Sequence, residues 1–156
     1  MAEPAPVPEH LRTVTPRLVV GDGTAAIAFY ERCFGAELLG ERFDGPNGEL
    51  IHAELRIGDA VVMLTQDGAD GPITSPDRVD GLVTCVMATY WPNVDEAWER
   101  ATDAGAEVIY PLADQFYGER GGRLRDPFGQ QWMMSQHIED VSPDELARRA
   151  AGYFEK

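Results

Sequence analysis

The sequence predicts an α+β fold built from two β-α-β-β-β units around a central groove, followed by a C-terminal helix. A helix-to-strand segment occurs twice, about 70 residues apart, which indicates duplication of one supersecondary unit. The two copies are residues 29–38 (FYERCFGAEL) and residues 97–108 (AWERATDAGAEV). Helix-capping residues and tight turns separate the remaining segments in the same order in both copies.

The first unit begins with a short strand at residues 17–20. Apolar side chains then recur at helical spacing, at Ala26, Ile27, Tyr30, Cys33 and Phe34. We expect Thr24 to cap this helix and Gly35 to end it. Three strands follow, at residues 37–43, 49–57 and 60–66. A Gly58-Asp59 turn joins the last two strands as a hairpin.

The second unit repeats this order. A strand at residues 83–89 precedes a helix that Asn93 caps, with Glu96 three residues on in a capping-box arrangement. Gly105 is placed to end this helix. Three strands follow, at residues 107–110, 121–125 and 131–136. The segment 126–129 (DPFG) joins the last two strands and suits a type I turn.

We expect one domain over residues 13–138. Its modules cover about residues 13–66 and 82–137, and a linker rich in Gly, Asp and Pro joins them at residues 67–81. The Pro- and Ala-rich residues 1–12 are expected to form a flexible tail. A C-terminal helix is predicted within residues 142–156, because Ser142 can cap it and Pro143 suits its first position. We expect this helix to pack on the outside or on a partner subunit.

Composition excludes several classes of protein. Hydrophobic residues make up 44% of the chain, as in a globular domain, and no apolar run is long enough for a transmembrane helix. The formal net charge of −14 disfavours contact with nucleic acid and anionic membranes. The N-terminus lacks the basic and apolar segments of a secretory signal, so a soluble, cytoplasmic protein is expected. Cys33 and Cys85 make no disulfide framework and are expected to be buried free thiols.

Strand alternation places a polar row on one sheet face in each unit. In residues 51–57 the odd positions are apolar, whereas the even positions are His52, Glu54 and Arg56. In the second unit, Leu124 should face the helix, with Arg123 and Arg125 on the opposite face. A concave, partly polar groove of this kind is a natural small-molecule site. The alternative is that these side chains form a solvated sheet face.

These segments resemble the vicinal-oxygen-chelate superfamily of glyoxalases, bleomycin-resistance proteins and dioxygenases, and in detail its PhnB-like branch. The matching segments are residues 15–20 (TPRLVV), 28–36 (AFYERCFGA), 52–59 (HAELRIGD), 114–120 (DQFYGER) and 122–129 (GRLRDPFG). The resemblance implies the paired-unit fold and a homodimer. It implies no single activity, because lyases, isomerases, dioxygenases and drug-sequestering proteins share this scaffold.

Enzymes of this superfamily usually hold a divalent metal with His and Glu or Gln side chains from the first and last strands of each unit. Strand order and turn positions place these four sites at Thr15, Met63, Val86 and Met133. None is a ligand for a hard divalent metal, which needs imidazole or carboxylate donors. We therefore expect no metal and no other cofactor. The two methionines would form a soft, adaptable groove floor, or else fill the core.

Other residues are candidates for ligand binding or catalysis. Tyr117 and Arg120 resemble part of a Trp-Gly-x-Arg segment of drug-binding members, and could stack and anchor a planar ligand. Trp91 lies just before the second helix, where it could rim the groove or pack under a loop. His52 and Glu54 point the same way along one strand and could act as an acid/base pair.

The leading hypothesis is a metal-independent protein that binds a small, partly apolar or aromatic molecule, with sequestration of an antibiotic-like compound as one use. The expected ligand-binding residues are Met63, Met133, Trp91, Tyr117, Arg120, Arg56 and Arg123. One alternative is an enzyme, either metal-free through His52 and Glu54, or a metal-dependent lyase, isomerase or dioxygenase with displaced ligands. Another is a regulatory or interaction module that uses the groove or a dimer surface.

Overall fold

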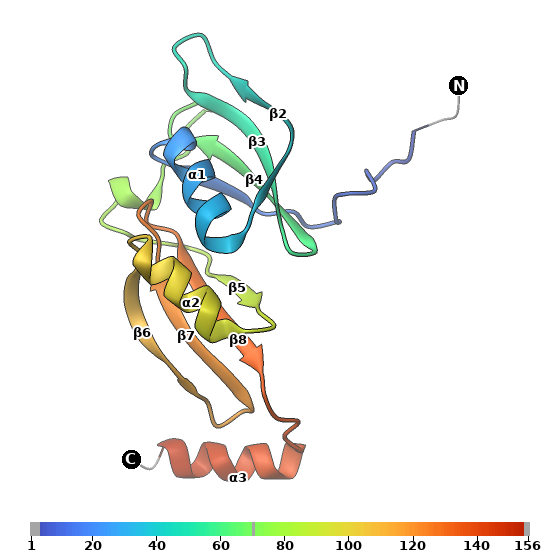
Figure 1. Ribbon diagram of the computed structural model, residues 1–156, viewed down its shortest axis with the longest axis vertical. Helices are drawn as coiled ribbons and strands as arrows, with labels where there is room; N and C mark the ends of the chain where they lie inside the picture. Colours follow the sequence, from blue (N-terminus) through green and yellow to red (C-terminus); the bar gives the residue numbers. More distant parts are fainter. Residues whose placement is uncertain (1–3, 70, 155–156) are drawn as a thin grey trace. The chain divides into compact units, whose positions relative to one another are not determined.

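The computed structural model describes residues 4–69 and 71–154 (Figure 1). Residues 1–3 of the predicted tail, residue 70 of the predicted linker and residues 155–156 of the predicted C-terminal segment lie outside the described residues. The chain forms two compact units, Met1–Leu82 and Val83–Lys156. Each unit contains one four-stranded sheet. The predicted α+β fold of two β-α-β-β-β units is therefore confirmed.

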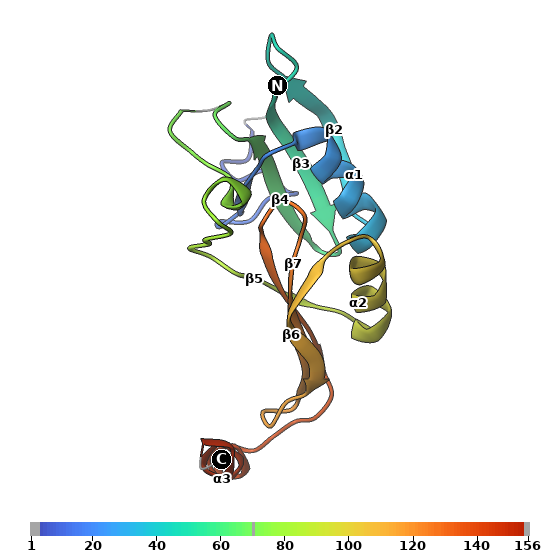
Figure 2. The same cartoon turned by 90° about the vertical axis from the view of Figure 1, so that its left-hand side faces the viewer.

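Unit 1 contains one helix and four strands before a short 3-10 helix. In chain order these are β1 (Arg17–Val20), α1 (Gly23–Phe34), β2 (Glu37–Asp44), β3 (Leu50–Ile57), β4 (Ala60–Gln66) and the 3-10 helix η1 (Pro76–Arg78). The strand order is β1-β4-β3-β2, with β1 parallel to β4 and the other neighbours antiparallel. α1 lies along one face of this sheet (Figure 2).

Unit 2 repeats this arrangement and adds the C-terminal helix. Its elements are β5 (Met87–Tyr90), α2 (Val94–Asp103), β6 (Glu107–Asp114), β7 (Glu119–Arg125), β8 (Gln131–His137) and α3 (Pro143–Phe154). The strand order is β5-β8-β7-β6, with β5 parallel to β8. No helix in the described part of the chain is long and apolar enough to cross a membrane.

The core of each unit lies between its sheet and its helix. The fully buried side chains include Val20, Tyr30, Leu55 and Leu64 in unit 1, and Val94, Leu124, Trp132 and Met134 in unit 2. Burying each large apolar side chain contributes roughly 1.5–3 kcal/mol. Because successive strand residues point to opposite faces, the face away from the helix is left to the alternate, more polar residues.

A glutamine at the end of the last strand ties the sheet to the start of the helix in both units. Gln66 Oε1 accepts hydrogen bonds from the backbone N–H groups of Gly23 at 3.2 Å and Leu50 at 3.3 Å. Gln136 Oε1 accepts one from the N–H of Val94 at 3.0 Å. The first N–H groups of a helix have no partner within the helix. The same side chain therefore positions the helix in each half of the repeat.

The structure differs from the prediction at the start of α1 and at the start of β5. Asp22, not Thr24, caps α1, and its Oδ1 accepts a hydrogen bond from the Ala25 N–H at 2.9 Å. Asp is at least as good a cap as Thr, and here it stands directly before the first helical residue. β5 begins at Met87, later than predicted. Cys85 therefore precedes the strand and is exposed, contrary to the expected buried thiol.

β6 is longer than predicted. The strand continues past Pro111 to Asp114, and its pairing with β7 shifts register on both sides of Tyr110. Proline lacks an N–H donor, but an edge strand with a bulge tolerates it, and β6 is the edge strand of this sheet. The additional residues of β6 extend one wall of the site described below.

Candidate functional site

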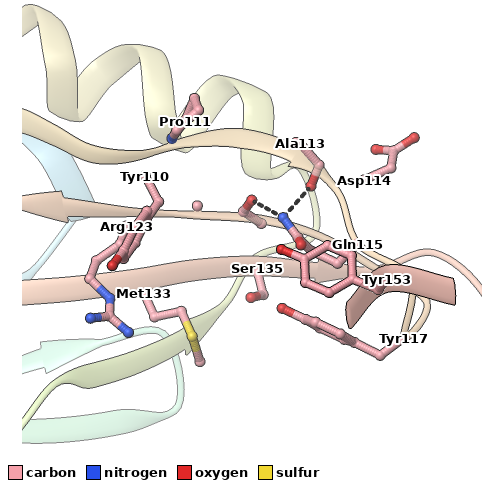
Figure 3. Close-up of a pocket in the computed structure, with 12 residues that line it drawn as sticks. Tyr110, Pro111, Ala113, Asp114, Gln115, Tyr117, Arg123, Met133, Ser135 and Tyr153 are labelled. Atoms are coloured by element: carbon pink, nitrogen blue, oxygen red, sulfur yellow. Dashed lines mark hydrogen bonds between the residues drawn. The ribbon is translucent and has the colours of Figure 1, made fainter. Parts of the chain in front are cut away.

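A pocket of about 640 Å³ lies within unit 2 (Figure 3). This volume is typical of small-molecule sites, which span roughly 300–1,000 Å³. The lining side chains come from β6, β7, β8, the β6–β7 turn and α3. They include Tyr110, Gln115, Tyr117, Arg123, Met133, Ser135 and Tyr153.

Strand register explains why these side chains share one face of the sheet. Arg123 of β7 pairs with Met133 of β8 on one side and with Tyr110 of β6 on the other. The next residues along each strand, Leu124 and Met134, point to the opposite face and are buried in the core. The pocket therefore forms on the sheet face turned away from α2.

Arg123 provides a cation at one end of the pocket (Figure 3). Its guanidinium carbon lies 5.3 Å from the centroid of the Tyr110 ring, within cation–π range. Its Nε is buried and has no hydrogen-bond partner among the described residues. An unsatisfied buried donor costs roughly 1–3 kcal/mol. Because Nε is buried, a ligand in the pocket would contact the two terminal amino groups instead.

Gln115, Tyr117 and Tyr153 lie together at the other end of the pocket (Figure 3). Gln115 Nε2 donates to the carbonyl oxygens of Ala113 and Gly121, both at 3.2 Å, which fixes the amide against the sheet. Burial raises the pKa of the Tyr117 hydroxyl, so it stays a neutral donor at physiological pH. This end offers aromatic surface with a few polar atoms at its edge.

The C-terminal helix contributes Tyr153 because α3 is tied to the β6–β7 turn. Arg149 forms ion pairs with Glu139 at 2.7 Å and Glu145 at 2.6 Å, and donates to the carbonyl oxygen of Phe116 at 3.3 Å. Hydrogen bonding to Arg149 lowers the pKa of Glu139. The ring centroids of Tyr153 and Phe116 lie 5.0 Å apart. α3 therefore contacts the β6–β7 turn of its own unit, and Tyr153 forms part of the pocket wall.

Two of the predicted ligand-binding residues of unit 2, Arg120 and Trp91, do not line this pocket. Arg120 forms ion pairs with Asp95 of α2 at 2.7 Å and with Asp114 at 3.0 Å. Hydrogen bonds to these two carboxylates raise the pKa of the guanidinium further above its usual value. Trp91 donates its indole N–H to Thr89 Oγ1 at 2.8 Å. In this arrangement both side chains are bound to other parts of unit 2 and do not reach into the pocket.

Unit 1 brings other predicted residues together on one sheet face. Glu54 is in register with Met63, which is half-buried. The two carboxylate oxygens of Glu54 lie 3.5 Å from His52 Nε2 and 2.8 Å from His10 Nε2. His10 comes from the segment predicted as a tail. Arg56 forms an ion pair with a β2 carboxylate at 2.6 Å.

The first-strand positions assigned to metal ligands are Thr15 and Val86, and both lie before the start of their strands. The parallel strand pairing places other residues beside the two methionines. Arg17 is in register with the methionine of β4, and Ala88 with that of β8. The residues beside the two methionines are therefore Arg17 and Ala88, each two positions after the residue that the sequence indicated. Neither an arginine nor an alanine side chain is a metal ligand.

The residues around the two methionines do not fit a divalent metal. A thioether suits soft ions, and the neighbouring guanidinium groups of Arg17 and Arg123 repel a cation. Glu54 supplies one carboxylate in unit 1, with its oxygens close to two imidazoles. Across residues 4–69 and 71–154, no three His, Cys, Asp or Glu side chains come together in a way that could hold a metal ion. No reaction step through a metal is assigned to either unit.

Nine of the twelve lining residues were not predicted, and four of these have polar or aromatic side chains discussed above: Tyr110, Gln115, Ser135 and Tyr153. Ser135 carries a signal in the sequence, because it lies two residues after Met133 and so on the same strand face. The other three carry none. Their places depend on the pairing of β6, on the turn after it, and on the docking of α3.

Comparisons with known proteins agree with the fold. The family model of the Glyoxalase/Bleomycin resistance protein/Dioxygenase superfamily matches residues 9–134. An uncharacterized protein of Mycobacterium bovis is 40% identical over 136 residues, which cover 85% of this chain and 88% of that protein. The crystal structure of TioX from Micromonospora sp. ML1 matches with a TM-score of 0.64 and 30% identity, over 81% of this chain and 99% of that chain. The PhnB protein from Bacillus cereus matches with a TM-score of 0.61 and 18% identity, over 80% of this chain and 99% of that chain, a likeness of fold alone. This protein belongs to the Glyoxalase/Bleomycin resistance protein/Dioxygenase superfamily.

Proposed function

We propose that this protein binds a small, partly aromatic molecule in the pocket of unit 2, without a metal and without changing it chemically. One observation carries the proposal. The sheet face of unit 2 that is turned away from α2 holds a pocket of about 640 Å³ in which aromatic rings, a thioether and a single guanidinium converge. A mostly apolar concavity with a few placed polar groups is the usual form of a ligand site.

The chemistry of the lining supports an aromatic ligand. Tyr117 and Tyr153 offer ring faces and edges at one end, and Tyr110 does so at the other. Met133 provides a polarizable, adaptable surface between them, and thioethers make favourable contacts with aromatic rings. Ser135 presents a hydroxyl in the middle of the pocket (Figure 3). A flat molecule with one or two polar substituents matches this lining.

Sequestration of an antibiotic-like compound is the use we propose for this binding. The family to which the chain belongs includes bleomycin resistance proteins beside glyoxalases and dioxygenases. Binding alone suffices for such protection when the protein is abundant, because the free concentration of the compound falls by mass action. The side chains around the two methionines do not fit a divalent metal. This favours binding of a small molecule over the metal-dependent activities of the family.

Calorimetry with a panel of naphthalene, quinoline, flavone and anthraquinone derivatives tests the proposal, in buffer with a chelator. We expect at least one compound to bind in the micromolar range. Met133→Gln should weaken that binding by about five- to tenfold, because a polar amide replaces the thioether surface. Met63→Gln is the matched control, since Met63 occupies the equivalent, half-buried position in unit 1. No binding across the panel, or equal weakening by both variants, would refute the proposal.

A second candidate function rests on unit 1. The carboxylate of Glu54 is hydrogen-bonded to His10 at 2.8 Å, and His52 lies 3.5 Å from its other oxygen. A carboxylate hydrogen-bonded to an imidazole can take part in proton transfer. This favours the alternative of a metal-free acid/base enzyme. Mass spectrometry of each bound compound after prolonged incubation with the protein tests it. A product that forms with the native chain but not with His52→Ala would establish catalysis and replace the binding-only proposal.

A further inference from the structure

We infer that the natural occupant of the unit 2 pocket carries an oxyanion, such as a carboxylate, at one edge of its aromatic part, and that Arg123 binds this group. The inference rests on the proposed function, because it names the ligand class of the same pocket. Neither the family membership nor the aromatic side chains of the pocket specify the charge of the ligand. The argument comes from the surroundings of one arginine.

Arg123 differs from most arginines of this chain. Other arginines form ion pairs with acidic side chains. These pairs are Arg42–Asp44, Arg56–Glu37, Arg78–Asp67, Arg120–Asp95, Arg125–Glu107, Arg148–Glu145 and Arg149–Glu139. Arg123 has no carboxylate within ion-pair distance among the residues that the structure describes. In a chain with a net charge of −14, an arginine that no acidic side chain neutralises is available for an anion from outside.

The pocket has no free negative charge of its own. Among the lining residues of the described chain, Asp114 alone is acidic. Its Oδ1 accepts a hydrogen bond from Arg120 at 3.0 Å, and its carboxylate points away from the pocket (Figure 3). Arg123 is therefore the one lining residue among the described residues whose charge has no carboxylate beside it. A cationic ligand would be repelled here, and a neutral one would leave the guanidinium unneutralised.

The geometry of Arg123 also limits how a ligand can bind it. The Tyr110 ring lies over the guanidinium at 5.3 Å and occupies one face of the planar group. Nε is buried and out of reach of a ligand, so the edge formed by the two terminal amino groups is the one that remains for hydrogen bonding. That edge presents parallel N–H groups with the spacing of the two oxygens of an oxyanion. The unmet hydrogen-bonding capacity therefore matches a carboxylate better than a single hydroxyl or ketone.

The floor between the two ends of the pocket leaves space for a ring. Gly121 lies there opposite Ser135 in the β7–β8 pairing. A Cβ added at Gly121 would stand 2.8 Å from Ser135 Oγ. Without that side chain, a planar group bound to Arg123 can extend along the sheet toward Tyr117 and Tyr153. The predicted ligand is thus an aryl carboxylate or a close chemical equivalent.

Three probes of the same shape test this inference: 2-naphthoate, 2-naphthamide and 2-naphthylmethylammonium. Titration calorimetry of the full chain should show that 2-naphthoate binds about tenfold or more tightly than 2-naphthamide, as a charge-assisted bidentate contact predicts. The ammonium probe should bind most weakly. Arg123→Gln should remove the preference for 2-naphthoate while leaving the affinity for 2-naphthamide within about twofold.

Arg125→Gln is the matched control. Arg125 lies on the same strand and the same face, two residues further on, and is paired with Glu107 outside the pocket. It should keep the full preference for 2-naphthoate. Gly121→Ala should weaken both aromatic probes alike, because the added methyl group rises from the floor.

The outcomes separate the inference from the proposed function. Equal affinity of the native chain for 2-naphthoate and 2-naphthamide would refute the oxyanion inference but leave an aromatic-binding pocket in place. A preference that Arg123→Gln retains, or that Arg125→Gln removes, would also refute it. Binding of neither probe at millimolar concentration would count against both the inference and the proposed function. The comparison of probes on the native chain needs no variant, so it stands even if Arg123→Gln fails to fold.

Discussion

Asp126→Asn should destabilise unit 2 by about 2–4 kcal/mol, because this buried carboxylate holds the turn between β7 and β8. Asp126 is 4% exposed. Its Oδ1 accepts hydrogen bonds from the backbone N–H groups of Phe128 and Gln130, both at 2.9 Å, and its Oδ2 accepts one from the indole N–H of Trp132 at 2.8 Å. The turn sets the pairing of the two strands on which the pocket is built.

The magnitude follows from what asparagine can replace. Its single oxygen can still accept the two backbone N–H groups, but its NH₂ then faces the indole N–H of Trp132, donor against donor. Trp132 is 1% exposed, so water cannot satisfy that N–H. Leaving a buried donor unsatisfied costs roughly 1–3 kcal/mol, and the loss of negative charge weakens the two remaining bonds by a further ~1 kcal/mol.

Urea unfolding followed by tryptophan fluorescence measures this loss. All three tryptophans of the chain, Trp91, Trp98 and Trp132, belong to unit 2, so the signal reports that unit. Trp132→Phe removes the indole donor while keeping an aromatic side chain in the core. In that background Asp126→Asn should cost clearly less.

The double-mutant cycle should therefore give a coupling energy of about 1–3 kcal/mol between residues 126 and 132. The single variant Trp132→Phe carries its own packing loss, which the cycle subtracts. A coupling below about 0.5 kcal/mol would refute the reasoning, because it would mean that the hydrogen bond to the indole does not hold the turn.

Three further predictions concern packing, pH and assembly. Gly122→Ala should destabilise unit 2 by about 1–3 kcal/mol, because the added Cβ would lie 2.5 Å from Trp98 Cη2 and 2.8 Å from the Tyr110 carbonyl oxygen; an unchanged urea midpoint would contradict this. The hydrogen bond from the Ser75 backbone N–H lowers the pKa of Asp67 below its ordinary value of 3.8. The ionised Asp67 carboxylate therefore stabilises the fold above pH 3.8, and this stabilisation is lost as the pH falls through the lower folded-state pKa. The difference in Tm between the native chain and Asp67→Asn should be largest near neutral pH and should shrink in acid. A difference in Tm that does not change with pH would contradict this prediction. The homodimer expected from the family resemblance predicts twice the monomer mass by light scattering after size exclusion, and a monomer mass at high protein concentration would exclude it.

The fold could be predicted because local signals and global architecture agree. The alternation in β3 placed Ala53 and Leu55 in the core and left Glu54 on the other face, and the structure confirms it. The caps Asn93 and Ser142 also hold, each accepting a hydrogen bond at its helix start. These features depend on residues close together in the chain, which a single sequence can reveal.

The site was harder to predict because it depends on pairing and docking. Arg120 was expected to bind ligand from its likeness to a family segment, yet it lies four residues before the buried Leu124 and so on the same face of β7. The alternation of side chains along β7 was enough to predict that Arg120 and Arg123 point to opposite faces of the sheet. Tyr153 could not have been found this way, because it reaches the pocket only through the contacts of α3 with Phe116.

The most direct test of metal-free binding in unit 2 is a methyl NMR titration. The chain has five methionines, and labelling their methyl groups with ¹³C places one probe at Met133 in the pocket and another at Met63 in unit 1. With a chelator present, the tightest compound of the aromatic panel should shift the Met133 methyl signal and leave that of Met63 unchanged. A Met133 signal that moves only after zinc, nickel, iron or manganese is added would contradict the account and indicate a metal-dependent protein.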